Sequence, residues 1–142
     1  MASVREIMTA DPEQVDADAQ VHEAALVMRE LNVGAVPVTS GGQVCGIITD
    51  RDITLRVLAE NRNPAEVKVR DVATSSIVTT APDTDVADAA RLMAEHQVRR
   101  LPVVEGGRLV GMLSLADVSL DGNARVAGTA LKEISSPAEP DR

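Results

Sequence analysis

The chain has 142 residues, of which 44% are hydrophobic and 25% charged, a composition typical of a small globular protein. Its formal net charge of −8 and its lack of any Phe, Tyr or Trp argue against nucleic-acid binding, which needs basic side chains and often aromatic stacking. The sequence has no basic amphipathic face, no apolar run of about 18 residues and no signal sequence. We therefore expect a cytoplasmic protein that associates with neither membranes nor nucleic acid.

A pattern of residues recurs at a constant offset of 65 positions, as from Val4 to Val69, without a gap over about fifty residues. One copy is too small to bury a good core by itself. We therefore predict an α/β (α+β) fold in which two βαββα units pack about a pseudo-twofold axis. The clearest matches are Val4-Arg5-Glu6-Ile7 with Val69-Arg70-Asp71-Val72, Met28 with Met93, Pro37-Val38 with Pro102-Val103, and Asp52 with Asp117.

In chain order, each copy is expected to begin with a short extended segment, at residues 13–16 and 77–80, followed by a helix. Asp18 and Asp83 are the expected helix N-caps, because apolar residues follow each of them at helical spacing. Two strands come next, joined by a glycine pair that accepts the positive φ of a tight hairpin turn. We expect these strands at residues 35–39 and 43–48 in the first copy and 100–104 and 108–113 in the second, each pair followed by a helix that starts at Thr49 or Ser114.

These elements place the first repeat at residues 1–62 and the second repeat at residues 63–122. The boundary falls at Arg62-Asn63-Pro64, a combination typical of a turn. A C-terminal helix is predicted within residues 123–134. Residues 135–142 contain two prolines and are predicted to form a flexible tail.

The sequence contains no recognisable catalytic set, since it has no P-loop, no G-x-G-x-x-G and no nucleophile elbow. His22 and His96 are not at metal-ligand spacing with each other or with Cys45, and we expect both histidines to face solvent. Cys45 lies in an apolar run and is expected to be a buried structural thiol. Met28 and Met93 are expected in the core. We therefore expect a protein that is not an enzyme and requires no metal or cofactor.

Two equivalent motifs, Thr49-Asp50-Arg51-Asp52 and Ser114-Leu115-Ala116-Asp117, stand where a strand ends and a helix begins. A hydroxyl residue followed three positions later by an acid resembles a capping box, which needs no ligand. The same arrangement suits a nucleotide, because a helix N-terminus and a hydroxyl favour a phosphate and a carboxylate can accept both ribose hydroxyls. Both interpretations stay open, and one motif can serve both.

Around these motifs the two copies resemble CBS domains, and the chain resembles a stand-alone bacterial tandem CBS pair, or Bateman module. The matching stretches are residues 34–38 and 44–53 in the first copy and 99–104 and 109–118 in the second. The resemblance extends from residue 4 to about residue 120. It implies two clefts between the copies, which in such families often hold adenosine nucleotides or S-adenosylmethionine.

The resemblance also implies a role for particular residues of this chain. Asp52 and Asp117 would bind ribose, while Thr49 and Ser114 would face phosphate. The apolar residues Val36 and Leu101, each before a proline, would flank the adenine. The site would be completed by Pro37, Pro102, Val15, Asp16, Thr80 and Ala81.

The two copies differ just before the proline, where the first has Gly34-Ala35 and the second has Arg99-Arg100. Because arginine is always charged and presents a planar fork to phosphate oxygens, we expect the site that uses Asp117 to prefer phosphorylated ligands. The first copy has Arg51 within its motif and is ranked second. Alternatively, the arginine pair forms ion pairs with Glu95 or Glu105.

The main hypothesis is therefore a regulatory module that binds AMP, ADP, ATP or S-adenosylmethionine and signals in trans to a separate protein. The alternative is a ligand-independent assembly or interaction module whose motifs only cap helices. A homodimer is expected in either case, because residues 53–58 and 118–120 supply apolar surface on the helical faces.

Overall fold

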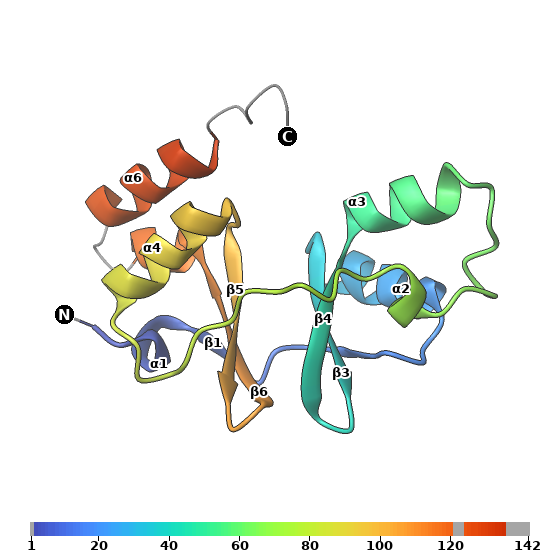
Figure 1. Cartoon of the computed structure of the whole chain (residues 1–142), viewed down its shortest axis with the longest axis horizontal. Helices are drawn as coiled ribbons and strands as arrows, with labels where there is room; N and C mark the ends of the chain where they lie inside the picture. The colour runs from blue at the N-terminus through green and yellow to red at the C-terminus, as the bar shows by residue number, and fades with distance from the viewer. Residues whose placement is uncertain (1, 121–123, 136–142) are drawn as a thin grey trace. The chain divides into compact units, whose positions relative to one another are not determined.

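The computed structural model describes residues 2–120 and 124–135, and it divides the chain into two compact units (Figure 1). Unit 1 contains Met1–Pro12, Val78–Gly106 and Val110–Arg142. Unit 2 contains Glu13–Ile77 and Gly107–Leu109. Each unit is a mixed α+β structure, as predicted, in which helices pack on a small sheet.

Unit 2 contains the first copy of the predicted pattern from its short extended segment onward. Its helix, hairpin and second helix follow the expected order, but the last helix continues as a π-helix, which the sequence did not predict. The elements are β2 (Val15–Asp16), α2 (Val21–Leu31), β3 (Ala35–Ser40), β4 (Gln43–Thr49), α3 (Asp50–Ile53), the π-helix η1 (Thr54–Leu58) and the 3₁₀ helix η2 (Val69–Asp71).

Unit 1 repeats this arrangement and adds a C-terminal helix, α6, at the predicted position. In place of the expected strand at residues 77–80, a single parallel bridge joins Thr80 to Val103. The elements are α1 (Val4–Ile7), β1 (Thr9–Ala10), α4 (Val86–His96), β5 (Arg100–Glu105), β6 (Arg108–Ser114), α5 (Leu115–Leu120) and α6 (Ala124–Ile134).

The sheet of unit 2 has β3 at its centre, paired parallel to β2 and antiparallel to β4. In unit 1, β6 pairs with β5 and, antiparallel, with β1. The predicted glycine turns are present, with φ values of 59° and 83° at Gly41 and Gly42 and of 60° and 82° at Gly106 and Gly107. Two consecutive positive φ values are typical of a type I′ turn, whose twist matches that of the hairpin strands.

The segment that leads each repeat is hydrogen-bonded to the body of the other repeat. The backbone N–H of Val4 donates to the carbonyl of Thr84 at 2.8 Å, and the equivalent N–H of Val69 donates to the carbonyl of Ala19 at 2.8 Å. The compact units therefore differ from the linear repeats 1–62 and 63–122, because the leading segments are exchanged between them.

The prediction that Asp18 and Asp83 cap the first helix of each copy is wrong. The helices begin two residues later, after Gln20 and Asp85, and the Asp85 side chain accepts a hydrogen bond from the backbone N–H of Ala87. Asp18 instead forms ion pairs with Arg70 and Lys68. The side chain of Asp18 therefore binds the exchanged segment rather than a helix end.

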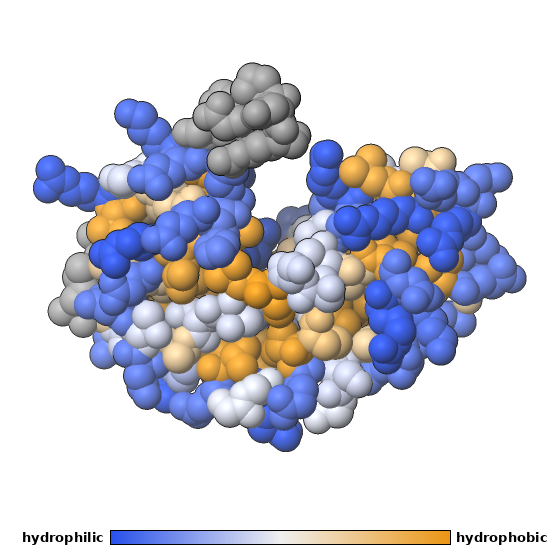
Figure 2. All heavy atoms as spheres, viewed as in Figure 1, coloured by the Kyte–Doolittle hydropathy of each residue, from blue (hydrophilic) through white to orange (hydrophobic). Residues whose placement is uncertain are grey.

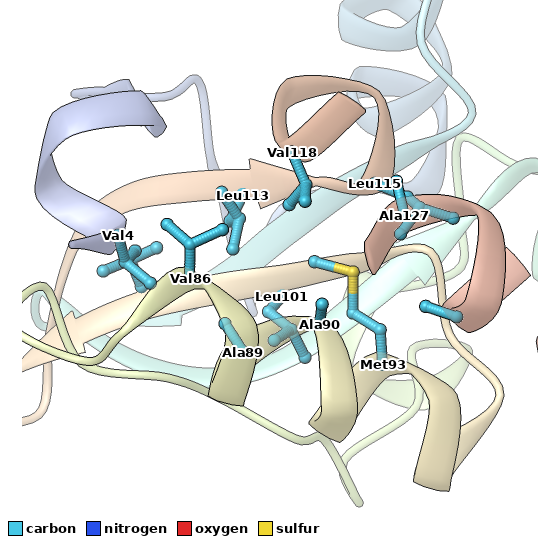
Figure 3. Packing of buried hydrophobic residues seen from close by; sticks show 12 residues of the cluster. Val4, Val86, Ala89, Ala90, Met93, Leu101, Leu113, Leu115, Val118 and Ala127 are labelled. Atoms are coloured by element: carbon cyan, nitrogen blue, oxygen red, sulfur yellow. The ribbon is translucent and has the colours of Figure 1, made fainter. Parts of the chain in front are cut away.

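Each unit has its own aliphatic core, as expected for a chain without aromatic residues. In unit 1 the core gathers around Met93, Leu101 and Leu113, all fully buried (Figure 3). In unit 2 the equivalent residues Met28, at 8% exposure, and Val36 are buried with Ile48. The prediction that both methionines are core residues is confirmed.

The prediction that Cys45 is a buried thiol is wrong, because its side chain is exposed. Along β4, Gly46 and Ile48 are buried, so the alternation of side chains places Cys45 on the opposite face of the strand. Its Sγ lies 3.5 Å from the carbonyl oxygen of Val38. His22 and His96 are exposed, as expected. Among the described helices, none has both the length and the apolar character needed to cross a bilayer.

Candidate functional site

Both repeat motifs form capping boxes at the start of a helix. The backbone N–H of Thr49 donates to Asp52 Oδ2 at 2.9 Å, and the N–H of Asp52 donates to Thr49 Oγ1 at 3.0 Å. In unit 1 the N–H of Ser114 donates to Asp117 Oδ2 at 2.9 Å, and the N–H of Asp117 donates to Ser114 Oγ at 3.1 Å. The interpretation of both motifs as helix caps is therefore confirmed, and a cap does not exclude a bound ligand.

The two carboxylates differ in what their second oxygen contacts. Asp52 Oδ1 lies 3.6 Å from Nη1 of Arg56, one helical turn away. Within residues 2–120 and 124–135, Asp117 has no ion-pair partner, and its Oδ1 accepts no hydrogen bond. Since an ionised carboxylate offers about four lone-pair sites, Asp117 keeps acceptor capacity beyond its cap.

A pocket of about 450 Å³ in unit 1 brings together three of the predicted site residues, Arg99, Arg100 and Ser114. Its remaining walls come from Leu115, Ala116 and Ser119 and from three residues of α6, Ala127, Gly128 and Leu131. This volume is within the range of about 300–1,000 Å³ typical of small-molecule sites.

Among the described residues that line this pocket, Arg99 and Arg100 are charged and none is acidic. Neither arginine has an ion-pair partner among the residues that the structure describes. Glu105, a suggested partner, instead contacts Arg5 at 3.3 Å. The alternative, in which Arg99 and Arg100 form ion pairs with Glu95 or Glu105, is therefore not found among the described residues, and the pocket is suited to an anion.

The acid of the second motif lies outside this pocket. Asp117 lines a separate hollow of about 220 Å³ together with Glu6, Ile7 and Leu120. A phosphate in the larger pocket would therefore contact the start of the motif, at Ser114, and not its acidic end.

The predicted adenine-flanking residues are part of the cores. Val36 and Leu101 are at most 1% exposed, and Pro37 and Pro102 beside them are buried as well. The side chains of these four residues are therefore packed in the interior of their units.

The last four predicted residues belong to the short segment ahead of each first helix. Val15 is buried and Asp16 exposed, while Thr80 is buried and Ala81 exposed. The hydroxyl of Thr80 is buried without a hydrogen-bond partner among the described residues. An unpaired buried hydroxyl is unusual and can be satisfied by a ligand or a water molecule.

The first copy carries a different charge at the positions equivalent to Arg99, Arg100, Leu115 and Ala116. Gly34 and Ala35 replace the arginine pair, and Asp50 and Arg51 replace Leu115 and Ala116. Both Asp50 and Arg51 are exposed, and the N–H of Arg51 donates to Asp50 Oδ1 at 2.8 Å. These four positions thus carry one acid and one base, whereas their counterparts in unit 1 carry two bases.

The sequence did not predict the contribution of α6 to the pocket. The residues missed are Ser119, Ala127, Gly128 and Leu131. Three of them lie in a helix that has no counterpart in the first repeat, so the repeat comparison that located the other residues gave no signal here. Within the described ranges, no group of three or more His, Cys, Asp or Glu side chains is placed to hold a metal ion.

Comparison with known proteins gives consistent matches over both repeats. The CBS domain model matches residues 4–59 and again residues 69–120. CBS domain-containing protein YhcV of Bacillus subtilis (strain 168) is 40% identical over 136 residues, which cover 95% of this chain and 96% of that protein.

Two similar crystal structures contain adenosine compounds. CBSX2 in complex with AMP is 27% identical, with a TM-score of 0.74, over 88% of this chain and 98% of that one. The CBS domain pair of protein MJ0100, in complex with 5′-methylthioadenosine and S-adenosyl-L-methionine, is 25% identical, with a TM-score of 0.76, over the same shares of the two chains. The duplicated fold, the paired motifs and these matches agree, and the chain belongs to the CBS domain family, with two CBS domains in tandem.

Proposed function

We propose that the chain binds an adenosine-containing nucleotide in unit 1 and acts as a regulatory module without catalysis of its own. The observation that carries this proposal is the pocket in which Arg99, Arg100 and Ser114 meet. The binding of AMP by CBSX2, and of 5′-methylthioadenosine and S-adenosyl-L-methionine by the MJ0100 pair, supports an adenosine ligand.

In the proposed complex the two arginines hold the phosphate, and the Ser114 hydroxyl donates to it. Guanidinium groups are suited to this role because their planar N–H fork matches phosphate oxygens. The serine can donate to the ligand while it still accepts the cap hydrogen bond, since a hydroxyl both donates and accepts. We propose that the ligand extends beyond this pocket toward the hollow that Asp117 lines, where Asp117 Oδ1 accepts hydrogen bonds from the ribose hydroxyls.

Isothermal titration with AMP, ATP, S-adenosylmethionine and adenosine tests this proposal. Arg100→Ala should weaken AMP binding by about tenfold or more, because a charge-assisted hydrogen bond contributes roughly 1.5–3 kcal/mol. Arg29→Ala is the matched control, since Arg29 is an exposed arginine of unit 2. Equal affinity for AMP and adenosine, or an unchanged affinity in Arg100→Ala, would contradict the phosphate role of the pocket.

We propose that the module does not hydrolyse the nucleotides that it binds. Hydrolysis would need a positioned base or a metal-held water, and the described residues of the pocket lining include two arginines but no carboxylate or histidine. Incubation with ATP should release no phosphate above the buffer control. Sustained release that Arg100→Ala abolishes would instead show an enzyme.

An assembly function is the second candidate, and exposed leucines on the last helix of the first repeat favour it. Leu55 and Leu58 are 48% and 65% exposed, and apolar side chains are visible at the surface near α3 (Figure 2). We propose that these leucines pack against a second copy of the chain, because neighbouring exposed apolar side chains that form a patch commonly mark a protein–protein interface. A ligand-independent dimer that binds no nucleotide would favour assembly as the function.

Light scattering with refractive-index detection should therefore give twice the 15.0 kDa chain mass. Leu58→Glu should shift the protein toward the monomer, because a carboxylate would be buried in the interface. Ser40→Glu adds the same charge at an exposed strand end and should leave the dimer unchanged. A monomeric wild type at tens of micromolar would contradict the proposed interface.

A further inference from the structure

The C-terminal helix α6 is part of the core of unit 1. It packs against α4 and α5, and Ala127 and Ala130 are 5% and 2% exposed in the same apolar cluster as Met93 (Figure 1). Residues on one side of this helix, Ala127, Gly128 and Leu131, also line the pocket that contains Arg99 and Arg100. The helix therefore joins the core of unit 1 to its candidate ligand site.

Gly128 leaves the pocket wall without a side chain. A Cβ added at this position would have no atom within 4 Å, so the space beside it is open. The backbone of Gly128 lies outside the positive-φ region, and alanine forms helices better than glycine does. Nothing in the helix thus requires a glycine, and the space beside it is open where Gly128 lines the pocket.

The pocket lining combines two kinds of surface. Arg99 and Arg100 supply positive charge, and Ser114 and Ser119 supply hydroxyl groups. The α6 residues supply apolar surface, and Leu131 is 42% exposed. Because the chain has no aromatic residue, a flat ring in this pocket must pack on aliphatic groups of this kind. A ligand with a phosphate and an apolar ring matches both surfaces.

In the part of the first repeat that the structure describes, no helix is equivalent to α6. After the π-helix Thr54–Leu58, the next element in the described chain is the 3₁₀ helix Val69–Asp71, whose counterpart in unit 1 is α1. The helix that lines the pocket in unit 1 is therefore an addition to the duplicated pattern. It gives the two copies different walls at equivalent sites.

We propose that α6 is a ligand-contacting wall of the unit 1 site and that Gly128 determines the size of ligand admitted there. This inference rests on the proposed nucleotide function and extends it. A nucleotide bound beside Gly128 contacts α6 directly, so its binding also holds α6 against α4 and α5. Occupancy of the site is thereby coupled to the order of the C-terminal helix.

Titration of AMP into Gly128→Leu tests the proposal, with Thr129→Leu as the matched control. Thr129 is the next residue of the same helix, is exposed, and lines a different groove between α4 and α6. Gly128→Leu should weaken AMP binding by at least about tenfold, because the added side chain occupies the pocket, whereas Thr129→Leu should bind as the wild type does. Wild-type affinity in Gly128→Leu would overturn the role of α6 and leave the nucleotide function intact. A wild type that binds no AMP would overturn both.

Hydrogen exchange on the wild-type protein provides a measurement that does not depend on the folding of a variant. Saturating AMP should slow the exchange of amides within residues 124–134 at least severalfold, because the ligand contacts this helix. Amides of α2, in unit 2, provide the internal control. Binding of AMP without any change in α6 exchange would overturn the proposal while preserving the proposed function.

Discussion

Arg70 and Asp18 are 52 residues apart in the sequence, yet Nε of Arg70 donates to Oδ1 of Asp18 at 2.8 Å. A second guanidinium nitrogen, Nη2, lies at the same distance from this oxygen. The pair fixes the segment that leads the second repeat to the body of the first. The equivalent pair in unit 1, Arg5 with Asp83, is longer, at 3.4 Å.

This pair predicts a pH-dependent contribution to stability. The hydrogen bond from Arg70, and its charge, hold the pKa of Asp18 below its ordinary value of 3.8. Because the pKa is lower in the folded state, the stabilisation is fully present above about pH 4 and is lost as the pH falls through the folded value. Asp18→Asn should therefore lower the urea midpoint slightly at neutral pH, and its difference from the wild type should disappear in strong acid.

The effect should be small, since both side chains are about half exposed and solvent screens such pairs. Asp83→Asn provides the control, because its longer pair with Arg5 should contribute less. A difference between wild type and Asp18→Asn that stays constant from neutral pH to strong acid would show that the pair does not stabilise the fold through charge.

The repeat made most helices and strands predictable from the sequence. The exchange of the leading segments between the two units could not be predicted. Hydrophobic spacing at Met28 and Met93 and the glycine pairs located the helices and hairpins to within a few residues. Local patterns carry no information on which distant segment an extended backbone will pair with. For the same reason Asp18, a good N-cap by composition, was assigned to a helix end when its partner is Arg70.

Gly46 and its repeat equivalent Gly111 should respond differently to alanine. A Cβ at Gly46 would lie 2.7 Å from the backbone carbonyl oxygen of Thr74, which cannot move without disturbing the sheet of unit 2. At Gly111 the nearest atoms belong to the flexible side chain of Met8, which can adopt another rotamer. Gly46→Ala should therefore destabilise the protein by about 1–3 kcal/mol, and Gly111→Ala by less.

Chemical denaturation of both variants measures this difference directly. The two substitutions add the same methyl group at equivalent positions, so each is the control for the other. Equal losses would mean that the sheet of unit 2 accommodates the methyl group at Gly46 as readily as Met8 does at Gly111.

The capping boxes predict a loss of stability that does not depend on any ligand. Thr49→Ala removes the acceptor for the N–H of Asp52 and should cost about 1 kcal/mol. Thr49→Ser keeps the hydroxyl and should be close to the wild type. Thermal unfolding without nucleotide distinguishes the two, and a Thr49→Ala midpoint equal to that of Thr49→Ser would show that the cap contributes nothing measurable.

The candidate site was predictable only where the two copies can be compared position by position. Thr49, Ser114 and the acids that follow them were found because a hydroxyl, an acid and a helix start recur together. Arg99 and Arg100 were found because they break that equivalence. Gly128 has no counterpart in the first copy. From sequence alone, a glycine within a helix indicates lower helix stability and gives no indication that it lines a pocket.

The final prediction concerns the difference between Asp117 and Asp52. Both acids accept a cap hydrogen bond through Oδ2, but Asp52 Oδ1 lies near Arg56, whereas Asp117 Oδ1 has no partner in the described chain. An asparagine at either position keeps an oxygen for the cap and removes the charge, so it separates ligand binding from helix capping.

Asp117→Asn should therefore weaken AMP binding in calorimetry by about tenfold, because a hydrogen bond to a charged group contributes roughly 1.5–3 kcal/mol. Asp52→Asn should change AMP affinity much less, because Asp52 lies in the first repeat, where Gly34 and Ala35 replace the arginine pair. Unchanged melting temperatures in both variants would confirm that the caps survive. If Asp52→Asn abolishes binding while Asp117→Asn retains it, the nucleotide occupies the first repeat and the arginine pair serves another purpose.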